Sequence, residues 1–165
     1  MATTYDSIAT TTLGSAAASI TFSSIAATYT DLRVVLVGTA TTGGSSLMAR
    51  YNSDATITYS WTELLGNGSA ASSGSGSNNR LYVSENATLD TTIPHMYTLD
   101  IFSYAGSIYK TSLSTAQADN NGSGNIERAV GLWRNTAAIN TILLYSGSDT
   151  FKTGTTATLY GIKAA

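Results

Sequence analysis

The sequence predicts an all-β protein, built as an antiparallel two-sheet sandwich of the jelly-roll or Greek-key type with about ten short strands. The first observation is composition. The 165 residues include fifteen glycines and one proline, and threonine, tyrosine, valine and isoleucine are frequent, which favours strands and tight turns. The second is that apolar and polar residues alternate in short runs between turn-forming residues, with no convincing helical period. The length fits one domain with its own core.

Residues 1–16 form the least apolar end of this pattern. They are mostly small and polar, and their only large anchors are Tyr5, Ile8 and Leu13. This spacing predicts an extended N-terminal docking arm that lies against something else. Residues 17–165 are then expected to form a single β-sandwich domain.

The first strands of that domain are expected at residues 19–25, 31–37 and 47–51. In the first, Ile20 and Phe22 alternate with small polar residues. The second contains LRVVLV, the most continuous apolar run of the chain, which predicts a central strand covered on both faces. The third follows the turn TATTGGS and has apolar residues at every second position.

The middle of the chain alternates between strand and loop patterns. Residues 57–61 (ITYSW) show the clearest alternation, which predicts a strand with one wet face. Residues 66–79 (GNGSAASSGSGSNN) predict a long loop that is either mobile or ordered by a partner. A short strand is expected at 81–84, followed by a polar link at 85–92.

The remaining strands are expected at residues 96–104, 108–113, 126–134, 139–145 and 157–162. Pro94 precedes the first of these, where proline is tolerated. The turn Ala-Gly-Ser at 105–107 joins the first two as a hairpin. Polar turns rich in glycine, serine and asparagine separate the other three.

The strand at 139–145 is apolar on both faces. Leu143 and Tyr145 fall on one face, and Ile142 and Leu144 fall on the other. A two-sheet sandwich covers only the inner face of each strand, so the outer apolar positions require a second layer. In a chain of this size that layer is expected to be another copy, which predicts self-association.

Composition also excludes several classes of partner. Charged residues make up 11% of the chain and the net charge is −2, so the surface lacks the positive field that holds a nucleic acid backbone. The absence of cysteine removes disulfides, thiol catalysis and thiolate metal sites. No apolar run reaches the roughly 20 residues that cross a bilayer, and no basic and apolar secretory signal opens the chain. We expect neither nucleic acid nor a membrane as partner.

The side chains that carry chemistry are few. His95 is the sole histidine and no GxSxG motif accompanies it, so a serine-histidine-acid triad is not expected. Carboxylates are scattered singly, although Glu63, Asp100 and Glu127 remain the candidates for an acid pair assembled by the fold. The oxygen-rich residues 119–125 lack the acid spacing of a calcium loop and are interpreted as a hairpin loop. We expect no enzyme activity, no metal and no cofactor.

Aromatic rings are the remaining candidates for ligand contacts. Tyr59, Trp61 and Trp133 are the candidate contacts to a partner or a glycan, because amphipathic rings stack on sugar faces and occur at protein contacts. Most of the aromatic residues are expected to serve in the core and between subunits instead.

Three segments carry a resemblance to a known family. They are SIATTTLGSAAASITFSSI followed by TYTDLRVVLVGTA, then VGLWRNTAAINTILLY, and the closing LYGIKAA. Together they resemble a family of small virion proteins of tailed bacteriophages, and the similarity runs over the whole chain. The resemblance implies a β-sandwich that serves as a subunit on the head or tail surface. It carries no catalytic or ligand-binding motif.

These observations lead to three hypotheses for function. The first is a capsid decoration (cement) or head-fibre subunit, made in the host cytoplasm and located in the virion, which self-associates, with a trimer favoured. It would dock on other virion proteins such as the major capsid protein or tail proteins. The second is a tail-tip receptor-binding module that recognises host glycans through its loops at 66–79 and 119–125. The third, ranked last, is a glycan-degrading enzyme.

Overall fold

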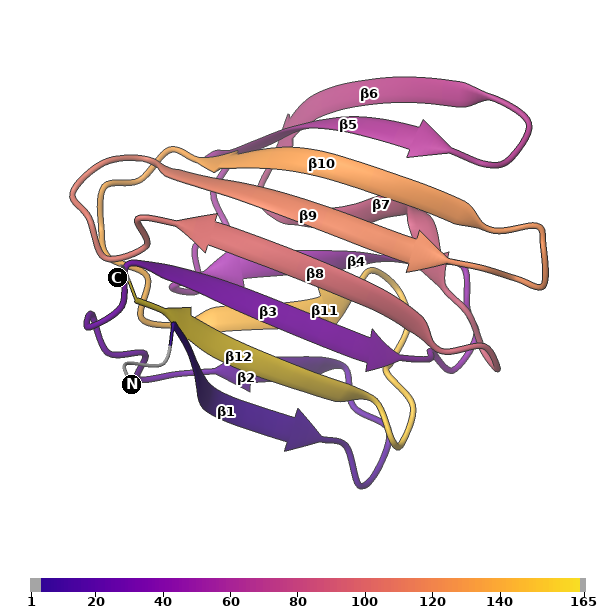
Figure 1. Ribbon diagram of the computed structural model, residues 1–165, viewed down its shortest axis with the longest axis horizontal. Helices are drawn as coiled ribbons and strands as arrows, with labels where there is room; N and C mark the ends of the chain where they lie inside the picture. Colours follow the sequence, from indigo (N-terminus) through magenta and orange to yellow (C-terminus); the bar gives the residue numbers. More distant parts are fainter. Residues whose placement is uncertain (1–3, 164–165) are drawn as a thin grey trace.

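The computed structural model describes residues 4–163, which form twelve β-strands and no helix (Figure 1). The strands make two sheets, one of eight strands and one of four, and every pairing is antiparallel. The predicted all-β, two-sheet architecture is confirmed. The sandwich has twelve strands where about ten were predicted.

The large sheet contains, in spatial order, β1 (Tyr5–Thr12), β12 (Thr156–Ile162), β3 (Asp31–Gly38), β8 (His95–Phe102), β9 (Lys110–Ala118), β10 (Asn125–Trp133), β5 (Tyr59–Gly66) and β6 (Ala71–Asn78). The small sheet contains β2 (Ser19–Phe22), β11 (Ile142–Ser146), β4 (Ser45–Tyr51) and β7 (Leu81–Leu89). In Figure 1 the large sheet lies in front of the small one, with β6 at its upper edge and β1 at its lower edge.

The strand pairs are nested along the chain. β1 pairs with β12, β2 with β11, β3 with β8 and β4 with β7. The chain therefore passes back and forth between the two sheets, and two hairpin pairs interrupt this alternation. The strands β5 and β6, and the strands β9 and β10, all join the large sheet and extend it beyond the small one. Of the small sheet, β7 contacts this extension most extensively, and Tyr51 at the end of β4 packs against Tyr59 of β5 and Trp133 of β10.

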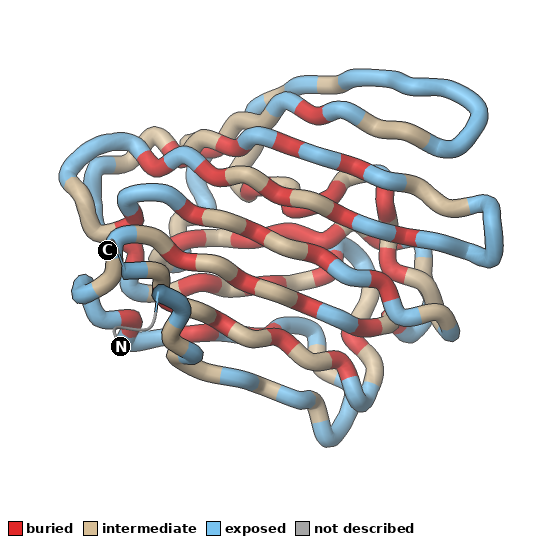
Figure 2. The backbone as a smooth tube through the Cα atoms, viewed as in Figure 1, coloured by how far each residue is buried: buried red, intermediate tan, exposed pale blue. Residues whose placement is uncertain are grey.

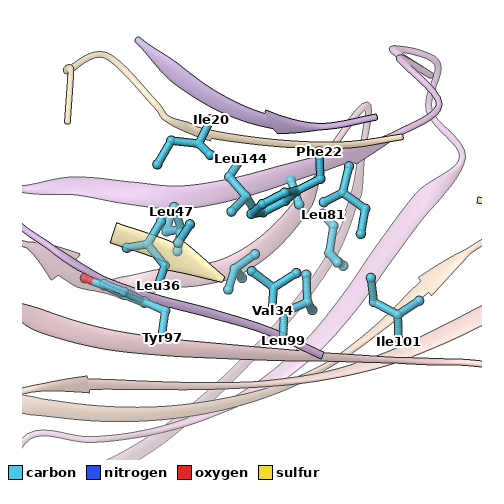
Figure 3. Close-up of a cluster of buried hydrophobic side chains, with 14 of the residues drawn as sticks. Ile20, Phe22, Val34, Leu36, Leu47, Leu81, Tyr97, Leu99, Ile101 and Leu144 are labelled. Carbon is cyan, nitrogen blue, oxygen red and sulfur yellow. The ribbon is translucent and has the colours of Figure 1, made fainter. Parts of the chain in front are cut away.

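The core lies between the two sheets, as alternating strands require. In β3, for example, Leu32, Val34 and Leu36 point inward and are at most 2% exposed, which confirms the central strand predicted at 31–37. Figure 3 shows a cluster of the buried side chains that meet there. Those labelled are Ile20, Phe22, Leu47, Leu81 and Leu144 from the small sheet, and Val34, Leu36, Tyr97, Leu99 and Ile101 from the large one.

The N-terminal residues form part of this sandwich. Residues 5–12 are the edge strand β1, which pairs with β12 from Tyr5 opposite Ile162 to Thr12 opposite Thr156. Ile8 and Leu13 pack against the core, whereas Tyr5 is 47% exposed. These residues are therefore a strand of the domain and not the separate docking arm predicted from their small size, and residues 1–3 of that arm lie outside the described residues. The pairing was hidden from the sequence because its partner strand lies at the opposite end of the chain.

The glycine-serine stretch predicted as a loop contains strand β6. Its register with β5 is unbroken, from Gly66 opposite Ala71 to Tyr59 opposite Asn78. Backbone hydrogen bonds form this strand, so its side chains need no apolar pattern. At Gly76 the missing side chain leaves room for a ring, since a Cβ there would lie 2.6 Å from the Trp61 indole. The glycines of this segment thus serve close packing as well as turns.

The segment predicted as a polar link is also a strand. Strand β7 continues to Leu89, and Ala87 and Leu89 are buried in the core. Its register with β4 shifts on either side of Leu47, which marks an irregular strand. The side chain of Glu127 bonds its irregular backbone, as described below, and sequence periodicity does not reveal such support.

A buried lysine closes the turn between β8 and β9. The Lys110 side chain is 1% exposed, and its ammonium donates to three backbone carbonyls, those of Gly106 (2.7 Å), Ile108 and Thr136 (3.4 Å). Burial lowers the pKa of Lys110. The ammonium satisfies carbonyl groups that otherwise lack these hydrogen bonds, so it is expected to stabilise the turn.

We expect Lys110→Met to destabilise the protein by about 2 kcal/mol, because methionine keeps the aliphatic stem but leaves these carbonyls without their donor. The free energy of unfolding from urea titration measures the loss. Lys163→Met is the matched control, since Lys163 is exposed and makes a surface ion pair with Asp6. Equal unfolding curves for the two variants would contradict the proposed role of Lys110.

Candidate functional site

The large sheet has one face that no element of the described chain covers. This outer face is the side that points away from the small sheet. It presents apolar side chains that are each at least 36% exposed, namely Val37, Leu64, Met96, Phe102, Ile126 and Val130. Figure 2 shows the alternation along its strands, with buried residues separated by intermediate and exposed ones. An exposed apolar surface of this kind marks an interaction site in a soluble protein.

The strand register places some of these side chains beside one another. Val37 of β3 lies opposite Met96 of β8. Val130 of β10 lies opposite Leu113 of β9, which is half-buried. These apolar residues thus form two cross-strand pairs, whereas Leu64 lies opposite Arg128 and Ile126 lies opposite Gln117.

The charges on this face largely cancel. Arg33 and Asp100 lie opposite each other on β3 and β8 and form a bidentate pair, with 2.5 Å from Nε to Oδ1 and 2.9 Å from Nη2 to Oδ2. Arg128 on β10 stands opposite Leu64. Around these residues the face is rich in threonine and serine, so little charge has to be desolvated when the face is covered.

Two hollows indent the outer face near β6. One of about 350 Å³ lies where small side chains of β5 and β6 border Val130 and Leu132. The other, of about 250 Å³, lies among Leu64, Leu65, Ala71 and Ile126. Projecting apolar side chains and hollows of side-chain size therefore stand next to each other on this face.

A pair of buried glutamates lies on the opposite, inner face of the same strands. Glu127 of β10 is 1% exposed. Its carboxylate accepts hydrogen bonds from the backbone N–H groups of Glu85, Asn86 and Ala87, each at 2.8 Å, and from the Ser84 hydroxyl at 3.0 Å. These four bonds tie the irregular part of β7 to the large sheet.

Glu63 of β5 is the second member of the pair and is 7% exposed. Its Oε1 accepts a hydrogen bond from the Asn86 side chain at 2.7 Å, and its buried Oε2 has no hydrogen-bond partner among the described residues. Burial, together with the charge of Glu127, raises the pKa of Glu63 to about 7. The physical consequence is that Glu63 binds a proton more tightly than an ordinary glutamate does.

The structure thus brings together two of the three carboxylates that were candidates for an acid pair. Asp100 does not join them, because it lies on the outer face with Arg33. A glycosidase needs its two carboxyl groups on either side of a bound sugar. Glu63 and Glu127 lie instead between packed strands, and neither of them lines the two hollows described above. Their hydrogen bonds give them a structural task.

The sequence analysis named both glutamates as candidates for an acid pair but did not predict that these two would be the ones to meet, although one signal was present. Glu127 stands between Ile126 and Arg128, so strand alternation places its acid on the face opposite the exposed Ile126. An acid at an inward position of a strand has to find hydrogen-bond partners. Which partners it finds depends on the irregular β7 backbone.

Two of the three aromatic residues predicted as partner or glycan contacts are buried. Tyr59 is 0% exposed and Trp133 is 1% exposed, and their rings stack with centroids 6.2 Å apart. The Trp133 indole donates to Asp54 at 2.8 Å. Neither ring is available to a glycan, so this part of the prediction is wrong. Tyr59 and Trp133 both lie in apolar runs of sequence, and such runs indicate a buried core position as readily as a surface contact.

Trp61 is half-buried and already has partners. Its ring lies 4.7 Å from that of Tyr82, and its indole N–H donates to the Glu85 carboxylate at 3.1 Å. It also fills the space above Gly76. Part of the ring remains accessible, so Trp61 is the one predicted aromatic contact that the structure leaves open to a ligand.

The remaining candidates have local structural contacts. His95 is 2% exposed, and its two ring nitrogens lie 2.8 Å from the Thr88 carbonyl and 3.0 Å from the Asn120 side chain. Asp119 accepts a hydrogen bond from the Gly122 N–H at 2.8 Å within the β9–β10 turn. Within residues 4–163 no three acidic or histidine side chains gather in a way that would hold a metal ion.

Comparison with known proteins adds no family to these observations. No protein-family model matches the sequence, and no curated protein matches it. In the part of the chain that the structure describes, no helix has the length and apolar character to cross a membrane. Function is therefore inferred from the surfaces and contacts described above.

Proposed function

We propose that this protein is a structural subunit of a tailed-bacteriophage virion, a capsid decoration (cement) or head-fibre protein whose copies associate through the outer face of the large sheet. The uncovered apolar face is the observation that carries the proposal. The resemblance of the sequence to small virion proteins supplies the phage context. The nested strand pairs, which alternate between two sheets, support a jelly-roll form of the sandwich with two added hairpins.

The size of the outer face fits a second copy of the chain. Eight strands about 4.8 Å apart, each about eight residues long, give a face of roughly 35 by 25 Å. That is roughly 900 Å² on each copy, close to the ~800 Å² per partner of a stable protein interface. A small ligand would cover only a fraction of such a surface.

The chemistry of the face also fits a second copy. Its central charges, Arg33 and Asp100, neutralise each other within one chain, so two such faces do not repel strongly. Projecting residues such as Ile126 and Leu64 lie beside hollows of similar size. A face that carries both projections and hollows is able to fit its own two-fold copy.

A face-to-face contact of this kind is isologous and joins copies in pairs. A trimer, which the sequence favoured, would require a different, heterologous contact. Native mass separates these two assemblies. In the virion, we infer that the assembled subunits dock on other particle proteins, such as the major capsid protein or tail proteins.

The double variant Leu64→Glu/Val130→Glu is expected to abolish the face-to-face contact. Both side chains are more than half exposed, so the fold tolerates the change, whereas an interface would have to bury four added charges. Sedimentation at micromolar concentration is expected to show a smaller assembly than the wild type. Ser19→Glu/Thr21→Glu on β2 of the small sheet is the matched control, because both residues are exposed and lie away from the outer face, and it is expected to leave the assembly unchanged. An unaltered mass for the face variant would refute the proposal.

The tail-tip receptor-binding alternative retains less support. Of its three aromatic contacts only Trp61 is accessible, and much of its long loop is strand β6. Binding of the isolated protein to a glycan array, lost on Trp61→Ala, would favour this alternative over the structural role.

A further inference from the structure

Strand β6 is an edge of the large sheet, and it lacks the features that commonly prevent an edge strand from pairing with a further strand. It is the last strand in the sheet, so it pairs with β5 on one side and leaves the hydrogen-bonding groups of its other side unpaired. Its sequence, ASSGSGSN, contains no charge, no proline and no large side chain. Figure 2 shows the strand exposed along most of its length. Natural sheets block such edges because they recruit further strands.

The opposite edge of the same sheet is protected. Strand β1 has a register shift between Ser7 and Ala9, which interrupts the regular row of hydrogen-bonding groups. It also carries Asp6, whose carboxylate lies 2.5 Å from the Lys163 ammonium. Strand β6 has neither feature, and its register with β5 shows no shift. The two edges therefore differ in their readiness to accept another strand.

We propose that β6 is a docking edge for the β6 strand of a second copy. The two strands pair antiparallel about a two-fold axis and join two eight-stranded sheets into one continuous sheet. This proposal rests on the proposed function in one respect, namely that copies of this chain assemble with one another. It uses a surface that is distinct from the outer face.

Three features favour β6 of a second copy over other strands. Serine and glycine side chains are too small to obstruct a neighbouring strand on either face. Antiparallel pairing keeps the two outer faces on the same side, so that their apolar surfaces become continuous. Pairing of β6 with the β1 edge of another copy would meet the register shift of β1, and it would be heterologous, which leads to rings or filaments.

The two self-contacts together predict an assembly of four copies. The edge contact makes one pair, and the outer faces of two such pairs then meet. Removal of the edge contact is expected to leave face-to-face pairs. Removal of the face contact is expected to leave edge-to-edge pairs. The two proposals therefore fail in different, measurable ways.

The test is the native mass of Ser72→Lys, an exposed position of β6 that lies opposite Leu65 and therefore points away from the outer face. Lysine on an edge strand opposes pairing with an identical edge by repulsion. We expect half the native mass of the wild type, with an unchanged unfolding midpoint. The matched control is Ser69→Lys in the turn between β5 and β6, an exposed position outside the strand, which is expected to keep the wild-type mass. A wild-type mass for the β6 variant would overturn the edge proposal and leave the face proposal standing.

A cross-linking experiment reports on the same contact directly. The chain has no cysteine, so Ser73→Cys, Ser75→Cys and Ser77→Cys each provide one thiol on β6. In the Leu64→Glu/Val130→Glu background, which removes the face contact, at least one of them is expected to give covalent dimers with a short bismaleimide, and Thr10→Cys is expected to give none. Dimer yields no higher than that of Thr10→Cys at all three positions would overturn the proposal.

Discussion

Replacement of Glu127 by glutamine is expected to lower the free energy of unfolding by about 3 kcal/mol or more. The Glu127 carboxylate is fully buried and accepts from three backbone N–H groups and the Ser84 hydroxyl. Glutamine has a similar size, but its NH₂ group replaces one of the two accepting oxygens. At least one buried N–H group then faces another donor and loses its partner. The charge assistance of the remaining hydrogen bonds is lost as well.

Urea titration at pH 6 measures this effect. Glu85→Gln is the matched control, because the Glu85 carboxylate is half-buried and accepts from the Trp61 indole. The control is expected to change the free energy of unfolding by about 1 kcal/mol or less. An effect of Glu127→Gln no larger than that of its control would contradict this account. It would show that the hydrogen bonds from Glu127 to β7 do not stabilise the contact between β7 and the extension of the large sheet.

Replacement of Glu63 by glutamine is expected to remove a loss of stability that the wild type shows between about pH 4.5 and pH 8. The pKa of Glu63 is about 7 in the folded protein, above its ordinary value of 4.5. The folded state therefore binds the proton more tightly than the unfolded state does. Stabilisation by this proton is complete below pH 4.5 and is lost as the pH rises through 7. Each pKa unit corresponds to about 1.4 kcal/mol, so the total loss is on the order of 3 kcal/mol.

Glutamine at position 63 reproduces the protonated state. Its carbonyl is able to accept from Asn86, and its NH₂ places no negative charge beside Glu127 at any pH. The difference between variant and wild type at each pH isolates Glu63, because all other titrating groups are common to both proteins. The variant is expected to match the wild type near pH 4.5 and to be more stable at pH 8. Parallel stability curves across this range would show that Glu63 is ionised throughout.

Strands whose pattern is local were predictable from the sequence. Leu32, Val34 and Leu36 alternate within one run, and β3 lies where that run predicted it. The hairpin of β8 and β9 follows from the short turn between two alternating runs. Strand β6 was missed because serine and glycine join the sheet through backbone hydrogen bonds alone. The second half of β7 was missed because its N–H groups bond Glu127, which is 42 residues from Glu85.

An apolar outer face was predictable from the sequence, but the strands on which it lies were not. Apolar outward positions were expected on the strand that contains Leu143 and Tyr145, and the structure leaves these two residues half-buried on the small sheet. The more exposed apolar residues, such as Leu64 and Ile126, lie on β5 and β10 instead. Their exposure follows from the extension of the large sheet beyond the small one. That extension depends on pairings between distant strands, which a single sequence does not reveal.

The measurement that tests the central claim most directly is the native mass of the wild-type protein, by light scattering over a dilution series from millimolar to nanomolar concentration. Self-association through the outer face predicts a mass of at least two 17.1 kDa chains at high concentration, with dissociation on dilution. A mass of one chain at every concentration would contradict the account, because the apolar outer face would then have no second copy to cover it.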